Sequence, residues 1–124
     1  MREDRQSLPV RRRFFFECYN CKNISSDALV LLFEKIVERS GMKLILPYQK
    51  AEVEDGVSIQ GIWEASTLSI HEWHEPRFVT VDIYSCKEIS PFFAVELIID
   101  ILEPEKITFG YIFPEEMVVI FWRE

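Results

Sequence analysis

The sequence predicts a single α+β domain in which two helices cover one face of a mainly antiparallel sheet. Two segments have the apolar spacing of amphipathic helices, and the segments expected as strands give the order β-α-β-β-β-β-α-β-β. Two helices are too few to connect the strands of a parallel sheet. With 124 residues, 48% of them hydrophobic and 28% charged, the chain fits one globular domain. We expect residues 1–10 to form a flexible tail and residues 11–124 to form the domain.

The first half of the chain contains two expected strands and the first helix. Residues 13–19 are rich in aromatic side chains, which is typical of a strand. Ser25 offers an N-cap and Gly41 a C-terminal cap for the helix. Its apolar stripe consists of Leu29, Leu32, Phe33, Ile36 and Val37. Residues 42–48 are expected as the next strand, and residues 49–55 as a polar, acidic connection.

The second half is expected to hold three consecutive strands, a helix and two final strands. The strands are predicted at residues 57–64, 67–73 and 77–85, with short turns between them. Ser90 is the expected N-cap of the second helix, with Pro91 at its first position. Its apolar stripe consists of Ala94, Leu97, Ile98, Ile101 and Leu102, before Glu103-Pro104 ends it. Residues 106–113 and 117–122 are the last expected strands.

The charge balance excludes several classes of partner. The 14 basic and 21 acidic side chains give a net charge of −7, whereas a nucleic-acid surface needs clustered Lys and Arg. The one basic run, Arg11-Arg12-Arg13, is expected at the end of a solvated tail. No apolar run approaches the roughly 20 residues of a membrane span. Because no apolar signal region precedes Phe14, we expect a cytoplasmic protein that binds neither nucleic acid nor membrane.

The three cysteines do not suit a closed disulfide framework, because their number is odd. Cys18 and Cys21 have the spacing of half a zinc site or of a redox pair. The chain has no second pair of this kind, and neither His71 nor His74 has ligand-like spacing to it. A structural pair is therefore the favoured interpretation, and we expect no metal site.

The predicted hairpin at residues 66–86 places reactive side chains on one face. Leu68 and Ile70 point toward the helices by strand alternation. The opposite, open face collects Thr67, Ser69, His71, Trp73, Thr80, Asp82, Tyr84 and Cys86. A turn centred on Glu75-Pro76 would pair His71 with Thr80 and Ser69 with Asp82. Since Trp, Tyr, His and Cys prefer partial burial, this face is predicted to be functional or an interface.

The same segment resembles a known family. Residues 64–75 read Glu-Ala-Ser-Thr-Leu-Ser-Ile-His-Glu-Trp-His-Glu, and Cys86 follows His71 by fifteen residues within Asp-Ile-Tyr-Ser-Cys. This is similar to the small bacterial and archaeal S-adenosylmethionine decarboxylases, with the usual pattern Glu-Ser-His-Leu-Ser/Thr-Ile-His-Thr-Trp-Pro-Glu, then Asp-hydrophobic-aromatic-Thr-Cys-Gly. The resemblance covers about residues 12–106 and implies that family's sandwich fold and a homodimer.

The resemblance implies that the chain cleaves itself to make a covalent pyruvoyl group. The Ser66 hydroxyl would attack the carbonyl carbon of Ala65, and elimination and hydrolysis would leave pyruvoyl at position 66. His71 would assist proton transfer during this processing. Ser58 matches a second processing hydroxyl. A turn centred near Ala65-Ser66 would place Ser58 across from Trp73, within a residue or two of His71.

The resemblance also implies roles in the mature enzyme. The pyruvoyl carbonyl would form a Schiff base with S-adenosylmethionine and act as an electron sink for loss of carbon dioxide, supplying aminopropyl groups for spermidine and other polyamines. Cys86 matches the proton donor to the substrate carbon. Glu75 matches the carboxylate that binds the ribose hydroxyls, and Trp73 an apolar wall. Leu68 and Tyr48 are the other expected substrate contacts, with Tyr48 the candidate for stacking on adenine.

Departures from the family pattern keep two other functions open. They are Ala65 for Glu, Thr67 for His, His74 for Pro, Ile59 for Gly and Lys87 for Gly. The segment at residues 47–56 is also longer than usual. The first alternative is a pyruvoyl-dependent decarboxylase of arginine, ornithine or another amino acid on the same fold. The second is an unprocessed homologue that has kept the fold without catalysis.

Overall fold

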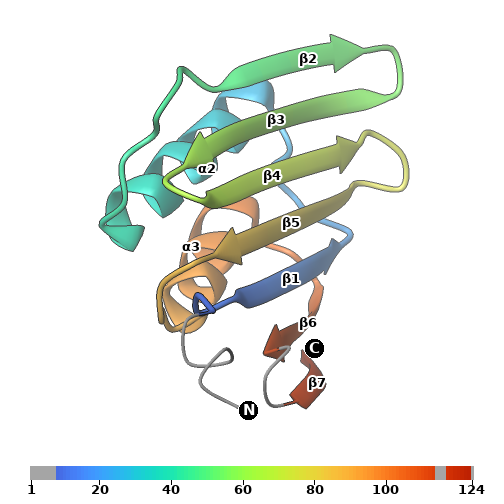
Figure 1. Cartoon of the computed structure of the whole chain (residues 1–124). Coiled ribbons are helices and arrows are strands. Elements are labelled where there is room, and N and C mark those ends of the chain that lie inside the picture. The colour runs from blue at the N-terminus through green and yellow to red at the C-terminus, as the bar shows by residue number, and fades with distance from the viewer. Residues whose placement is uncertain (1–7, 114–116, 124) are drawn as a thin grey trace.

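The structure is a computed structural model that describes residues 8–113 and 117–123. Its elements follow the predicted order, as Figure 1 shows. They are β1 (Arg12–Tyr19), α2 (Ser26–Ser40), β2 (Gln49–Val53), β3 (Gly56–Trp63), β4 (Ser66–Trp73), β5 (Phe78–Ser85), α3 (Phe92–Leu102), β6 (Lys106–Phe113) and β7 (Met117–Arg123). Residues 1–7 of the expected tail lie outside the described residues. No helix among the residues described is long and apolar enough to cross a membrane.

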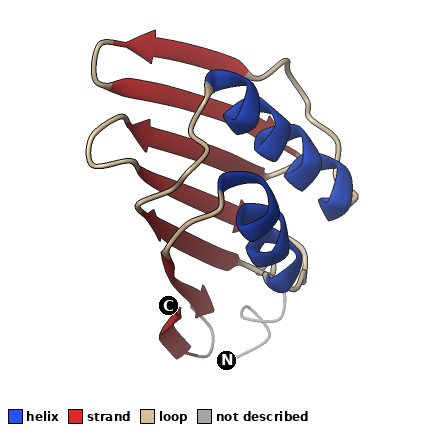
Figure 2. Cartoon of the chain, turned by 180° about the vertical axis from the view of Figure 1, so that it is seen from behind, coloured by secondary structure: helices blue, strands red, loops and turns tan. Residues whose placement is uncertain are grey.

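The strands form one antiparallel sheet in the order β2-β3-β4-β5-β1-β6-β7. Both helices lie against the same face of this sheet (Figure 2). The core fills the space between the two layers, and its largest fully buried side chains are Trp63, Phe14, Phe16 and Phe33. The predicted α+β architecture is therefore confirmed, with one sheet face covered by helices and the other left open.

The helix boundaries follow the predicted signals closely. The Ser25 hydroxyl accepts a hydrogen bond of 3.1 Å from the Ala28 N–H, and Gly41 ends α2 in the left-handed region at φ 76°. At α3 the prediction was one residue early. Pro91 is the N-cap instead of the first helical residue. The Ser90 hydroxyl oxygen accepts a hydrogen bond of 3.3 Å from the Phe92 N–H.

The prediction of a strand at residues 42–48 was wrong. That segment is a loop with one isolated bridge between Leu44 and Trp63, and β2 occupies the stretch that was expected to be a connection. All five residues of β2 are exposed, because β2 is an edge strand that pairs only with β3. An exposed strand has no apolar alternation in its sequence, whereas the loop residues Met42 and Tyr48 are apolar because they cover the core.

Candidate active site

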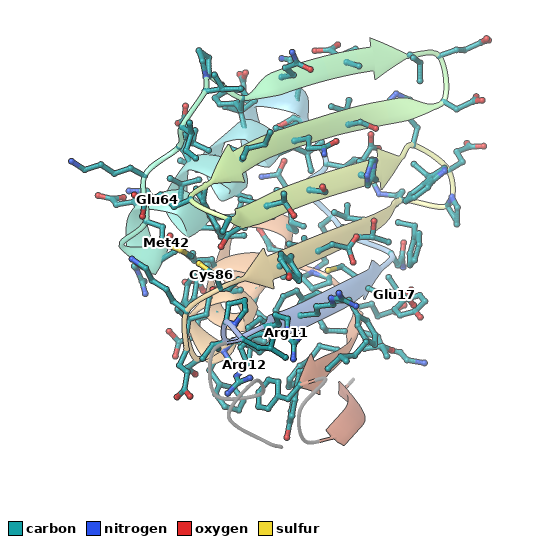
Figure 3. The ribbon with its side chains drawn as sticks, viewed as in Figure 1. Arg11, Arg12, Glu17, Met42, Glu64 and Cys86 are labelled. Carbon is teal, nitrogen blue, oxygen red and sulfur yellow. The ribbon has the colours of Figure 1, made fainter. Side chains whose placement is uncertain are left out.

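Ser66 and Cys86 meet at the end of the sheet where β4 begins. The Cys86 backbone N–H donates to Ser66 Oγ over 3.0 Å, and the Ser66 hydroxyl donates to Cys86 Sγ over 3.6 Å. The Cys86 thiol in turn donates to the carbonyl oxygen of Glu64 over 3.3 Å. Figure 3 shows Cys86 and Glu64 side by side at this end. Both a backbone and a side-chain group of Cys86 therefore fix the hydroxyl of Ser66.

The peptide before Ser66 has an unusual backbone conformation. Ala65 lies in the β3–β4 turn with φ 50°, which is the left-handed region that side chains other than glycine avoid. This conformation costs roughly 1–2 kcal/mol per residue. Strained residues of this kind persist at sites where the surrounding structure enforces them, and catalytic sites are common among them. The predicted cleavage position therefore combines a fixed hydroxyl with a strained residue.

Ser58 and His71 form a second polar pair on the neighbouring strands. They are direct partners in the β3–β4 register, and Ser58 Oγ lies 2.8 Å from His71 Nδ1. The predicted register was wrong by two residues, because the turn is centred on Glu64-Ala65 and Trp73 pairs with Gly56 instead. On the other side of β4, the predicted pairs of His71 with Thr80 and of Ser69 with Asp82 are confirmed.

The two pairs do not meet within one chain. His71 follows Ser66 by five residues on the same strand, so about 16 Å of extended backbone separates them. The burial of β4 alternates, which places Ser66 on the helix-covered side and His71 on the open face. The resemblance had implied that His71 assists proton transfer during processing at Ser66. In the structure, His71 can assist Ser66 only if the two side chains come from different chains.

The expected substrate contacts divide into exposed and buried groups. Trp73, which is 42% exposed, ends β4, and Glu75 is exposed in the β4–β5 turn. Leu68 is fully buried on the helix-covered face. Tyr48 packs on Phe33 with 5.0 Å between the ring centroids. Leu68 is thus a core residue, whereas Tyr48 is only partly buried beside the core.

The open face near His71 is aromatic and acidic. Trp73 lies 5.6 Å from Phe78, and Tyr19 lies 5.2 Å from the same ring, measured between centroids. Desolvation raises the pKa of Asp82; the nearby His71 opposes this shift and Glu17 adds to it. Carboxylates and aromatic rings attract cations, and on this face Lys106 lies 5.2 Å from the centroid of the Tyr19 ring and Arg13 lies 5.1 Å from that of Tyr84.

Cys18 and Cys21 are buried free thiols in the core. Burial raises the pKa of both, and that of Cys21 reaches about 11 although Arg77 opposes the shift. Within residues 8–113 and 117–123, no group of three or more His, Cys, Asp or Glu side chains could hold a metal ion. The burial of both thiols in the core supports the structural interpretation of the pair.

Sequence reasoning missed one feature of the site. Glu72 lies between His71 and Trp73, and its side chain is buried on the helix-covered side of β4, where it contacts the His74 ring. The signal was available, because a glutamate interrupts an otherwise apolar alternation that runs through Leu68 and Ile70.

Comparison with known proteins identifies the family. A sequence profile described as S-adenosylmethionine decarboxylase matches residues 12–113. An S-adenosylmethionine decarboxylase proenzyme of Aeropyrum pernix is 33% identical over 100 residues, which cover 77% of this chain and 75% of that protein. An arginine decarboxylase proenzyme of Ignicoccus hospitalis is 34% identical over 88 residues, covering 68% of this chain and 61% of that one.

A solved structure supports the fold. The adenosylmethionine decarboxylase of Aquifex aeolicus superposes with a TM-score of 0.72 at 22% identity, over 86% of this chain and 91% of that chain. The extent of the profile match and the identity to the archaeal proenzymes agree with the motif that surrounds Ser66. The chain belongs to the S-adenosylmethionine decarboxylase family.

Proposed function

We propose that the chain cleaves itself between Ala65 and Ser66 and then decarboxylates S-adenosylmethionine. The observation that carries the proposal is the contact of Ser66 Oγ with the N–H and thiol of Cys86 beside the left-handed Ala65. The names of the archaeal relatives and the matching family profile indicate S-adenosylmethionine as the proposed substrate. The exposed ring of Trp73 on the open face is of the kind that attracts a positive sulfonium.

Self-cleavage uses groups that this chain supplies. The Ser66 oxygen attacks the carbonyl carbon of Ala65, the C–N bond breaks, and an ester replaces the peptide. Loss of a proton from the serine α-carbon then expels the carboxylate of Ala65, leaving dehydroalanine at position 66. Water converts this residue to a pyruvoyl group and releases ammonia. A serine is required because the same oxygen is first the nucleophile and then part of the leaving group.

The residues around position 66 fit a pyruvoyl group. Position 66 begins a strand directly after a turn, so cleavage leaves it at a free chain end beside Cys86. A pyruvoyl group supplies an electron sink for the electrons that remain when carbon dioxide leaves. Cys86 Sγ lies 3.6 Å from Ser66 Oγ, which is close enough for a group proposed to protonate the substrate carbon at this position.

The active protein is proposed to be a homodimer with shared sites. Ser66 and Cys86 lie at one end of β4, while Ser58, His71 and the turn that carries Glu75 lie toward the other end. A second copy that packs with its open face toward the end of the sheet where β4 begins would bring its His71 and Glu75 to the Ser66 and the partly buried Cys86 of the first. The half-buried aromatic residues of the open face are of the type found in such interfaces.

Arginine is the second candidate substrate, because one of the relatives is an arginine decarboxylase proenzyme. The proposed role of Glu75 distinguishes the two substrates. A ribose diol would donate two hydrogen bonds to this carboxylate, and a site built for such contacts discriminates strongly against ligands that lack them. S-Adenosylmethionine should therefore release carbon dioxide faster than arginine or ornithine, and Glu75→Gln should weaken its use without slowing self-cleavage.

The decisive experiment is the intact mass of the purified protein. Wild-type protein should resolve into residues 1–65 and a second fragment that begins with a pyruvoyl group at position 66. Ser66→Ala should remain one chain, while the control Ser69→Ala, on the open face of the same strand, should cleave. Wild-type protein that stays full length after prolonged incubation would refute self-cleavage and support the interpretation as a non-catalytic homologue. On cleaved protein, faster release from arginine than from S-adenosylmethionine would establish the second candidate.

A further inference from the structure

The β4–β5 turn carries Glu75 and is exposed, so its geometry depends on anchors outside the turn. Figure 1 shows this turn beside the β2–β3 turn, at the end of the sheet opposite Ser66. Trp73 and Glu75 flank His74 in the sequence. A side chain that binds a substrate must be held within about half an ångström of its productive position. The contacts that hold His74 in place therefore influence the positions of its neighbours Trp73 and Glu75.

Glu72 is the first anchor, and it is a buried carboxylate. Its side chain has no exposed surface and lies on β4 between Val57 of β3 and Val79 of β5. Glu72 Oε2 lies 2.7 Å from His74 Nδ1, while Oε1 has no hydrogen-bond partner in the described part of the chain. A buried carboxylate is costly unless it is paired, so Glu72 strongly favours the conformation that brings His74 to it.

The backbone of His74 provides two further anchors. Its N–H donates to the carbonyl oxygen of Asp55 in the β2–β3 turn over 2.9 Å. Its carbonyl oxygen accepts from the Arg77 N–H over 3.1 Å. The side chain of Arg77 then donates from Nε to the carbonyl oxygen of Cys21 over 2.7 Å. The turn is thereby connected to β4, to the β2–β3 turn and to the segment after β1.

A proline at position 74 would restrain the backbone by its ring but would have no N–H to donate to Asp55. In this chain the hydrogen bonds of the His74 ring to Glu72 and of the His74 N–H to Asp55 restrain the turn instead.

We propose that Glu72 and His74 are positioning residues, which together hold the β4–β5 turn so that Trp73 and Glu75 are presented to the substrate. This inference rests on the proposed function for the role of Glu75. The pair touches neither Ser66 nor Cys86 and has no part in self-cleavage. Its effect is therefore on substrate binding, and each partner is useful only in the presence of the other.

The test is a cycle of Glu72→Thr, His74→Pro and the double variant. Each single variant should raise KM for S-adenosylmethionine about tenfold, with kcat and the rate of self-cleavage within about twofold of wild type. The double variant should have a KM within about threefold of wild type, because no buried carboxylate is then left unpaired and the proline ring restrains the backbone in place of the hydrogen bond to Asp55. The matched control Glu54→Thr, in the exposed β2–β3 turn, should leave KM unchanged.

Hydrogen exchange tests the same inference without catalysis. Amides of residues 73–78 should exchange at least tenfold faster in each single variant and recover in the double variant, while residues 64–69 stay unchanged. Glu72→Gln, which keeps a hydrogen-bond acceptor, should exchange at nearly the wild-type rate. Single effects on KM that simply multiply in the double variant, or unchanged exchange at residues 73–78, would overturn the proposal. Uncleaved protein without turnover would instead refute the proposed function, and the exchange result would still decide the role of the pair.

Discussion

Two variants that cannot process alone should restore cleavage when they are combined in one dimer. The first is Ser66→Ala, which removes the nucleophile, and the second is His71→Ala, which removes the imidazole. Proton transfer requires a donor and acceptor within about 3 Å. The five residues between these positions on β4 correspond to about 16 Å, and the two side chains lie on opposite sides of the strand. One chain therefore cannot supply both groups to one site.

The size of the effect follows from pairing statistics. When equal amounts of the two variants pair at random, about half of the His71→Ala chains have a Ser66→Ala partner. Each such dimer contains one site with an intact Ser66 and an intact His71 from different chains. About half of the His71→Ala chains should therefore cleave at the wild-type rate, and no Ser66→Ala chain should cleave.

The assay is co-expression with distinguishable tags, followed by intact mass of each chain over time. A partner that carries both Ser66→Ala and His71→Ala is the matched control, since it forms the dimer without supplying the imidazole. The reasoning is refuted if His71→Ala chains cleave no faster with the Ser66→Ala partner than with the control. It is equally refuted if His71→Ala protein alone cleaves at the wild-type rate.

Three further predictions use other parts of the structure. Cys86→Ala should still cleave, because the backbone N–H that holds the serine hydroxyl remains, but it should lose about 100-fold or more in carbon dioxide release. An alkylating reagent at pH 8 should label Cys86 in the native protein and not Cys18 or Cys21, because burial raises the pKa of both buried thiols and keeps them protonated. Gly56→Ala should destabilise the fold by about 1–3 kcal/mol in urea denaturation, because a Cβ would lie 1.9 Å from the Glu72 carbonyl oxygen.

Each of these predictions has a result that contradicts it. Full turnover of cleaved Cys86→Ala would remove the proton-donor role from that thiol. Rapid labelling of all three thiols in folded protein, in contrast to labelling only after denaturation, would show that the Cys18–Cys21 pair is accessible. Unchanged stability of Gly56→Ala would mean that β3 and β4 can separate at this point without cost.

The sequence predicted those elements that have two different faces. Both helices and the strands β3, β4 and β5 alternate between a buried and an exposed side, and this contrast is what apolar periodicity reports. β2 was missed because it has no buried side at all. Periodicity detects burial and not hydrogen bonding, so an exposed edge strand resembles a polar loop, and a loop that covers the core resembles a strand.

The structure brings together only part of the predicted candidate site. The spacing of Ser66, His71 and Cys86 resembled the family, and Ser66 and Cys86 are indeed in contact. His71 is not in contact with Ser66, because five residues of an extended strand separate the two positions by about 16 Å. The register of Ser58 depends on which two residues form the β3–β4 turn, and a turn containing a left-handed Ala65 gives no sequence signal.

The separation along β4 also constrains how two copies can meet. In an isologous dimer in which β4 of one copy packs over β4 of the other, each Ser66 comes level with the partner's His71 only if the twofold axis passes over β4 midway between them, near residues 68 and 69. Leu68 points into the core, which leaves Ser69 as the open-face residue nearest the axis. A residue on a twofold axis meets its own copy, and a small side chain allows the close approach that this requires. The positions of the two polar pairs on one strand therefore determine both the register of the proposed interface and the residue at its centre.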